Sequence, residues 1–162
     1  EKVSFYQVQI DSKTNEIKAI PALLETIDCE GSTITIDAIA SQRDITKKII
    51  EKRADYFFGL KSNQGYLFEQ VSDWLRSRKT TLPSFVEMDK DHGRGEIRST
   101  YTCEDLQFLE ETYEWSGLMS IVMTESRRLI DGKETTSERF YISSLSGSKP
   151  EQYARLVRDH GA

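Results

Sequence analysis

The sequence predicts an α/β fold, in which a mixed sheet flanked by helices is joined to an antiparallel, β-rich segment. The chain has 162 residues, of which 37% are hydrophobic and 30% are charged, the balance of one folded domain. Strand and helix patterns alternate over the first half, which is typical of a parallel sheet covered by helices. In the second half apolar residues repeat at every second position, and Asp131-Gly132 is a strong hairpin signal. The second half is therefore expected to be antiparallel.

Three strands and three helices are predicted in the first half. The strand patterns are apolar and are rich in β-branched or aromatic residues, and they cover residues 3–10, 32–38 and 54–60. The helix patterns repeat apolar residues at three- and four-residue spacing, over residues 20–27, 41–53 and 67–75. Pro21 is tolerated in the first turn of its helix, and Ser41 is a candidate N-cap with Asp44 three positions later.

The second half is predicted to be mostly strands. A strand begins at residues 85–88, a polar loop covers 89–95, and a second strand at 96–103 has one face in water. A short helical segment is expected at 106–113, followed by strands at 118–130 and 133–143. Residues 148–151 form a good helix start, and Tyr153, Leu156 and Val157 supply the apolar stripe of that last helix.

Composition limits the environment and the class of protein. No apolar run approaches the roughly 20 residues that cross a bilayer, and no secretory signal is visible, so we expect a cytoplasmic protein without membrane contact. Cys29 and Cys103 lie far apart and are expected to be buried thiols. The net charge of −5 argues against a free-standing DNA-binding module. Because there is no initiator Met, we expect the chain to be cut from a longer one.

Asp37 is the leading candidate for catalysis and metal binding. It lies where an apolar strand gives way to a polar turn, and ligands of open α/β sheets bind beyond the carboxyl ends of strands. A carboxylate there is suited to a divalent metal, and the alternative is that Asp37 caps the next helix. Lys61, Asn63 and Gln64 follow a neighbouring strand and are candidates for contacts with DNA phosphates, although Asn63 could instead cap a helix.

A second group of candidates lies in the predicted hairpin tip. His92, Arg94 and Arg98 carry donors that could meet DNA phosphates, while the alternative is a plain turn in which Glu96 pairs with a neighbouring Arg. The basic clusters at 76–79 and 127–128 are interpreted as solvated faces.

Six segments in order resemble the DDE transposases of bacterial insertion sequences, in particular the H-repeat-associated group. The resemblance covers nearly the whole chain. The segments are Ser12-Lys13-Thr14-Asn15-Glu16-Ile17 with Ala19–Leu24, Thr35-Ile36-Asp37-Ala38 with Gln42, Ala54-Asp55-Tyr56, Leu60–Gln64, His92-Gly93-Arg94, and Tyr141–Leu145.

The resemblance implies a ribonuclease H-like core in which two Asp and one Glu hold two Mg²⁺ or Mn²⁺ ions. In this family the metals serve phosphodiester cleavage and strand transfer. The implied partners are the transposon ends and the target DNA, and the whole protein is a candidate homo-oligomer. Asp37 matches the second Asp of the family. The first Asp would precede this chain and the Glu would follow it, so the fragment alone is expected to be inactive and to bind Mg²⁺ weakly at best. The implied division is residues 1–80 as partial core, 81–146 as insertion, and 147–162 as the start of the helix that leads to the Glu.

Two other functions remain open from the sequence. The chain could be a degenerate, non-catalytic remnant that acts as a folded DNA- or protein-binding module. It could also be a ribonuclease H-like nuclease unrelated to transposition.

Overall fold

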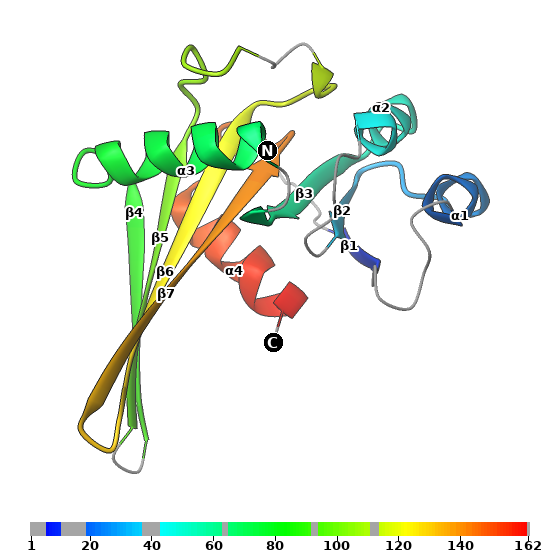
Figure 1. Ribbon diagram of the computed structural model, residues 1–162. Coiled ribbons are helices and arrows are strands. Elements are labelled where there is room, and N and C mark those ends of the chain that lie inside the picture. The colour runs from blue at the N-terminus through cyan, green and yellow to red at the C-terminus, as the bar shows by residue number, and fades with distance from the viewer. Residues whose placement is uncertain are drawn as a thin grey trace.

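The computed structural model describes residues 6–10, 19–36, 43–62, 65–91, 94–110 and 114–161 (Figure 1). The helices of this part of the chain are α1 (Ile20–Thr26), α2 (Arg43–Glu51), α3 (Tyr66–Arg78) and α4 (Pro150–Gly161). The strands are β1 (Tyr6–Ile10), β2 (Ser32–Ile36), β3 (Asp55–Leu60), β4 (Ser84–Asp91), β5 (Arg94–Cys103), β6 (Ser120–Ile130) and β7 (Lys133–Ser143). Within these ranges, no helix is both long enough and apolar enough to pass through a lipid bilayer.

The strands form one seven-stranded sheet in the order β1-β2-β3-β7-β6-β5-β4. β1, β2 and β3 are parallel, as the alternation of strands and helices predicts, and α1 and α2 connect them. β7 then pairs antiparallel with β3, with Leu60 opposite Phe140 and Phe57 opposite Ser143. The mixed α/β class is therefore confirmed, and the antiparallel strands extend the same sheet.

The two faces of the sheet are covered by different helices. On one face a large core joins α1, α2 and α3 to strand residues such as Ile34, Tyr56 and Ile121. On the other face Phe57, Val122 and Tyr141 pack against Tyr153 and Leu156 of α4. Alternating residues of β3, Tyr56 and Phe57, thus enter different cores, because successive side chains of a strand point to opposite faces. In Figure 1, α3 lies in front of the long strands and α4 lies behind them.

Three details of the second half differ from the sequence prediction. The polar loop predicted at 89–95 is wrong, because β4 continues to Asp91 and β5 begins at Arg94. The helical segment predicted at 106–113 is wrong in its described part, where a turn joins the Leu109 amide to the Leu106 carbonyl. The single wet face predicted for 96–103 is also wrong near its end, where Thr100, Thr102 and Cys103 are all buried. Helices on both faces bury this end of the sheet, which a two-residue period does not reveal.

The other ends of β4 to β7 extend past the helices as an antiparallel ribbon (Figure 1). We use "the ribbon" for the part of these strands at 85–91, 94–100, 124–130 and 133–139, which lie opposite one another in register. The hairpin between β6 and β7 turns at Asp131 and Gly132, which both have positive φ, as predicted. The two faces of the ribbon are named after helices. The α3 face continues the side of the sheet that α3 covers, and the α4 face continues the side that α4 covers.

Candidate functional site at the strand-end edge and the ribbon

The carboxyl ends of β2 and β3 lie side by side at the same end of the sheet, which is called the strand-end edge. Ile36 ends β2 opposite Phe58, and β3 continues to Leu60. Lys61 follows Leu60 directly and is exposed. Asp37 is the next residue after β2 in the chain but lies outside the described residues, and so do Asn63, Gln64 and His92. The structure therefore describes the edge at which the candidate residues begin, and among them only Lys61, Arg94 and Arg98 themselves.

Helix α4 runs toward this same edge. Its first turn lies beside Leu145, just after β7 has ended opposite Phe57 at the amino end of β3. Its last turn places Arg158 against Glu87 of β4. The row through Glu87 crosses the sheet to Ser137 of β7, three residues before the Phe140 that pairs with Leu60. The carboxyl end of α4 therefore lies level with, and slightly beyond, the carboxyl end of β3.

A cluster of serines joins β7 to β3 at the other end of these strands, near the amino end of β3. The hydroxyl of Ser144 accepts the Tyr56 amide at 2.8 Å and donates to the carboxylate of Asp55 at 2.7 Å. The hydroxyl of Ser143 donates to the Tyr56 carbonyl at 2.7 Å and accepts the Leu145 amide at 3.0 Å. These bonds continue the strand ladder through side chains where the strands themselves end. They hold the parallel and antiparallel parts of the sheet in register.

Ser120 and Tyr153 extend this cluster to α4. The Ser120 hydroxyl donates to the Leu145 carbonyl at 2.7 Å and lies 2.8 Å from the Tyr153 hydroxyl. Burial raises the pKa of Tyr153, although the hydrogen bond with Ser120 works in the opposite direction. Burial, with the nearby Asp55 carboxylate, also raises the pKa of Tyr56, whose hydroxyl donates to the Ser116 carbonyl. Both phenols are thus held neutral, as structural donors rather than as bases.

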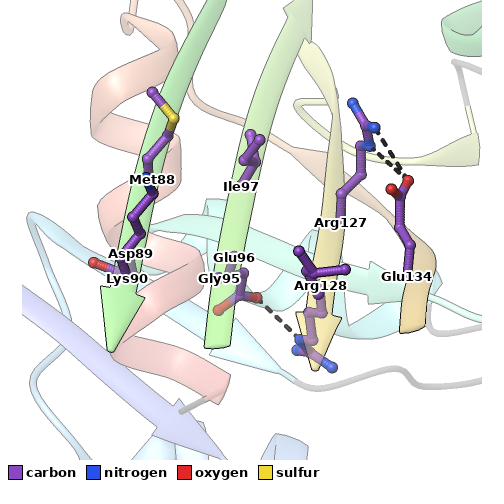
Figure 2. Close-up of a pocket in the computed structure, with 10 residues that line it drawn as sticks. Met88, Asp89, Lys90, Gly95, Glu96, Ile97, Arg127, Arg128 and Glu134 are labelled. Carbon is purple, nitrogen blue, oxygen red and sulfur yellow. Dashed lines mark hydrogen bonds and ion pairs between the residues drawn. The ribbon is translucent and has the colours of Figure 1, made fainter. Parts of the chain in front are cut away.

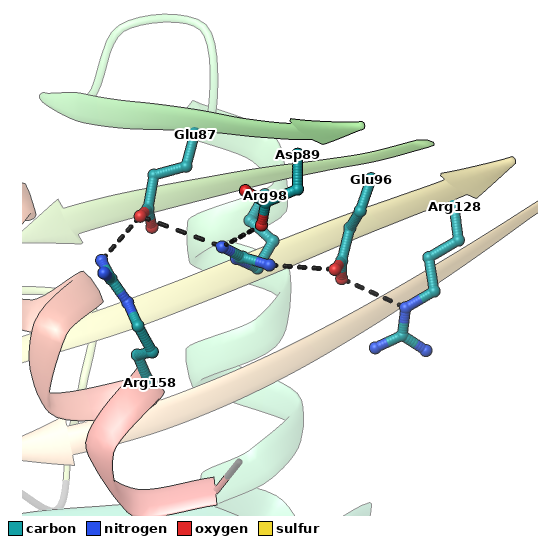
Figure 3. Close-up of polar contacts among 6 residues, drawn as sticks. All are labelled: Glu87, Asp89, Glu96, Arg98, Arg128 and Arg158. Carbon is teal, nitrogen blue, oxygen red and sulfur yellow. Dashed lines mark hydrogen bonds and ion pairs between the residues drawn. The ribbon is translucent and has the colours of Figure 1, made fainter. Parts of the chain in front are cut away.

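A ladder of alternating charges crosses the α4 face of the ribbon (Figure 3). From α4 inward, Arg158 Nη2 lies 2.6 Å from Glu87, and Arg98 Nη2 lies 3.9 Å from the same Glu87 oxygen. Arg98 also contacts Asp89 and Glu96, each at 2.9 Å. Glu96 in turn binds Arg128 Nε at 3.1 Å. Three carboxylates therefore engage Arg98, which the sequence predicts as a DNA contact. Glu96 pairs with two arginines, and pairing with a neighbouring Arg is what the alternative interpretation of the hairpin tip expects.

The opposite face of the ribbon carries a shallow pocket (Figure 2). Met88, Ile97 and Leu129 contribute aliphatic side chains to it, and the Arg127–Glu134 ion pair, at 3.1 Å, lies at its side. Met88 is 71% exposed and Leu129 is 48% exposed. The character of this hollow is apolar, so it does not fit a metal ion or a phosphate.

The basic clusters lie on the surface as predicted, but their charges are paired. Arg76 contacts Glu138 at 2.9 Å and Lys79 contacts Glu125 at 3.2 Å, which attaches α3 to the ribbon. Arg78 stacks over the Trp74 ring at 3.5 Å. Both cysteines are buried free thiols, as expected.

No three His, Cys, Asp or Glu residues of the described ranges come together as a metal site. Sequence reasoning also missed Glu87, Arg128 and Arg158 as members of the charge ladder. The signal for part of it was present, because Glu87 and Asp89 on one strand of a hairpin face Arg98 and Glu96 on the other. The contribution of α4 was not visible, since Arg158 is 71 residues away from Glu87 in the chain.

Comparison with known proteins identifies the class. The model of the Transposase DDE domain matches residues 2–161, so the chain belongs to that family. The "H repeat-associated putative transposase YhhI" of Escherichia coli strain K12 is 35% identical over 162 residues, 95% of this chain and 43% of that protein. The "Putative transposase YncI" of E. coli O157:H7 is 38% identical over 164 residues, 95% of this chain and 41% of its own length. An "Uncharacterized protein in dhlA 3'region" of Xanthobacter autotrophicus is 36% identical over 140 residues, 85% of this chain and 48% of that protein. The resemblance to the H-repeat-associated group is thereby confirmed, and the chain spans less than half the length of these relatives.

Proposed function

We propose that this chain is part of the catalytic domain of a DNA transposase, which cleaves and joins phosphodiester bonds with the help of divalent metal ions. The observation that carries the proposal is the position of Asp37 in the chain. In the chain it directly follows β2, which ends beside β3, and the last turn of α4 lies against β4 at about the level of these strand ends. A carboxylate at such an edge is suited to a ligand-binding role in an α/β sheet.

The arrangement of elements supports a ribonuclease H-like core. Three parallel strands are joined by helices, and the long antiparallel strands are inserted between α3 and α4. On this proposal residues 1–80 are part of the core, 81–146 form the β-rich insertion, and 147–162 return to the core. The insertion contributes the ribbon, which projects past the strand-end edge and would lie beside bound DNA.

Metal chemistry requires more ligands than the described residues provide. A carboxylate oxygen of Asp37 fits the ligand preference of Mg²⁺ or Mn²⁺, and such an ion would stabilise charge on the reacting phosphate. One candidate ligand does not make a metal centre. The remaining proposed roles are phosphate contacts by Lys61, Asn63 and Gln64 at the edge, and by His92, Arg94 and Arg98 on the ribbon.

The test is DNA cleavage by the full-length protein that contains this sequence. Strand cleavage and transfer are measured on duplexes carrying the element ends, with Mg²⁺ or Mn²⁺ present. Replacing the ligand, Asp37→Asn, is expected to lower the cleavage rate by about a hundredfold or more, because a metal ligand is lost. Asp28→Asn is the matched control, since Asp28 is an exposed carboxylate just before β2, at the far end of the same strand. Cleavage by Asp37→Asn within threefold of the unchanged protein would refute the proposal.

A further inference from the structure

The two faces of the ribbon differ in charge. The α4 face carries five cationic side chains from the strands, which are Arg94, Arg98, Arg128, Lys133 and Arg139. Its anionic side chains are Glu87, Asp89, Asp91 and Glu96. The α3 face carries the cations Lys90 and Arg127 and the anions Glu125, Glu134 and Glu138. The shallow apolar pocket that Met88 lines lies on this face, toward the tip of the ribbon. Among the strand side chains cations therefore exceed anions only on the α4 face, and Arg76 and Lys79, near the end of α3, add two paired cations to the other face.

One cation of the α4 face lies close to the carboxyl end of β3. Arg139 occupies the position on β7 just beyond the pairing of Phe140 with Leu60, next to where Lys61 follows β3. Within the described ranges, no ion pair engages Arg139, Arg94 or Lys133. Arg139 is therefore the cation of the α4 face that lies nearest the carboxyl end of β3.

The central arginines of this face are neutralised by the protein's own carboxylates. Glu96 is shared by Arg98 and Arg128, and Glu87 is shared by Arg98 and Arg158 (Figure 3). The two carboxylates are the least exposed groups of the ladder, at 19% for Glu87 and 23% for Glu96, whereas Arg128 and Arg158 are each 54% exposed. Glu87 and Glu96 thus lie against the sheet while Arg128 and Arg158 reach outward, and Asp89, at 66%, is the most exposed member of the ladder. A phosphate that approaches Arg128 or Arg158 from solvent must compete with the carboxylates of Glu96 and Glu87 beneath them.

We propose that the α4 face of the ribbon binds nucleic acid and that Glu87 and Glu96 lower its affinity for the phosphate backbone. They do so because they form ion pairs with the arginines that would otherwise bind phosphates. The inference rests on the proposed function and adds which face binds and which residues restrain it. Affinity for phosphates depends on how many cations are available to replace counterions, so each released arginine raises both the affinity and its salt dependence.

The test measures binding of the 162-residue chain to a 30-base-pair duplex of random sequence, by fluorescence anisotropy in EDTA at several salt concentrations. Glu96→Gln is expected to lower the Kd by about three- to tenfold at low salt and to steepen the slope of log K against log salt by about 1. Glu87→Gln, which releases Arg158, is a second and independent variant with the same expected direction. Adding Arg128→Gln to Glu96→Gln is expected to return the Kd to within about twofold of the unchanged chain, because Arg128 is removed again while Asp89 and Glu87 still hold Arg98.

Glu134→Gln is the matched control. It removes the same charge and releases Arg127, but on the α3 face. It is expected to change the Kd by less than about twofold. Equal gains for Glu134→Gln and Glu96→Gln would show a general charge effect and overturn the inference. So would unchanged or weaker binding by both Glu96→Gln and Glu87→Gln. Because this assay contains no metal, its outcome is separate from the cleavage test of Asp37, and either proposal can fail while the other stands.

Discussion

Replacing Ser144 with alanine tests whether the serine cluster holds the two parts of the sheet together. The Ser144 hydroxyl is the partner of the Tyr56 amide, at 2.8 Å, and Ser144 is only 8% exposed. In Ser144→Ala the buried amide loses this partner, which costs about 1–3 kcal/mol. The Asp55 carboxylate also loses a donor at 2.7 Å, but it is partly exposed and can bind water, so its loss adds about 0.5–1 kcal/mol. The expected decrease in the free energy of unfolding is about 1.5–4 kcal/mol.

The measurement is urea unfolding followed by circular dichroism, with a thermal melt in parallel. For a chain of this length the loss corresponds to a decrease in Tm of about 3–16 °C, with an unchanged m-value. Ser77→Ala is the control, because Ser77 is exposed and donates only to the Trp74 carbonyl one turn earlier in α3. It is expected to cost less than about 0.5 kcal/mol. A loss for Ser144→Ala that is no larger than the loss for Ser77→Ala would refute the role of the cluster.

Two further predictions concern packing and pH. Gly117 has φ +69°, and a Cβ there would lie 2.7 Å from Ile50 Cδ1, so Gly117→Ala is expected to cost about 2–3 kcal/mol. Gly147 has φ +71° with open space around it, so Gly147→Ala is expected to cost only the backbone strain of about 1 kcal/mol; equal losses in urea unfolding would contradict the Ile50 contact. Because the pKa of Tyr56 is raised in the folded state, the unfolded chain releases this proton first as the pH passes about 10, and stability falls above that pH by up to about 1.4 kcal/mol per pH unit. Tyr56→Phe is expected to flatten this fall in chemical unfolding between pH 9 and 11.5, and an identical slope in both proteins would show that Tyr56 does not contribute.

Local patterns in the sequence were sufficient for most of the elements. The run from Lys133 to Ser143 alternates and follows a turn pair, and β7 has these bounds. The stripe of Tyr153, Leu156 and Val157 does pack against the sheet. Such patterns are reliable because hydrophobic period, turn residues and helix starts act within a few residues of one another.

Part of the candidate site could also be predicted. The position of Asp37 after β2 and of Lys61 after β3 follows from the parallel order of these strands, although the arrangement of Asp37, Asn63, Gln64 and His92 remains a prediction. The wet face predicted at 96–103 failed near Cys103, because burial there depends on α4, which lies about 50 residues further along the chain.

The sequence by itself determined the class of fold, the family and nearly all strand and helix positions, since these depend on short-range spacing and on motifs read in order. Only the tertiary structure decided that β7 pairs with β3, that the last turn of α4 lies against β4, and that Arg158, Glu87, Arg98 and Arg128 form one ladder. These contacts join groups up to 87 residues apart, which meet because the sheet must bury both of its faces. A one-dimensional pattern carries no record of which side chains that burial brings together.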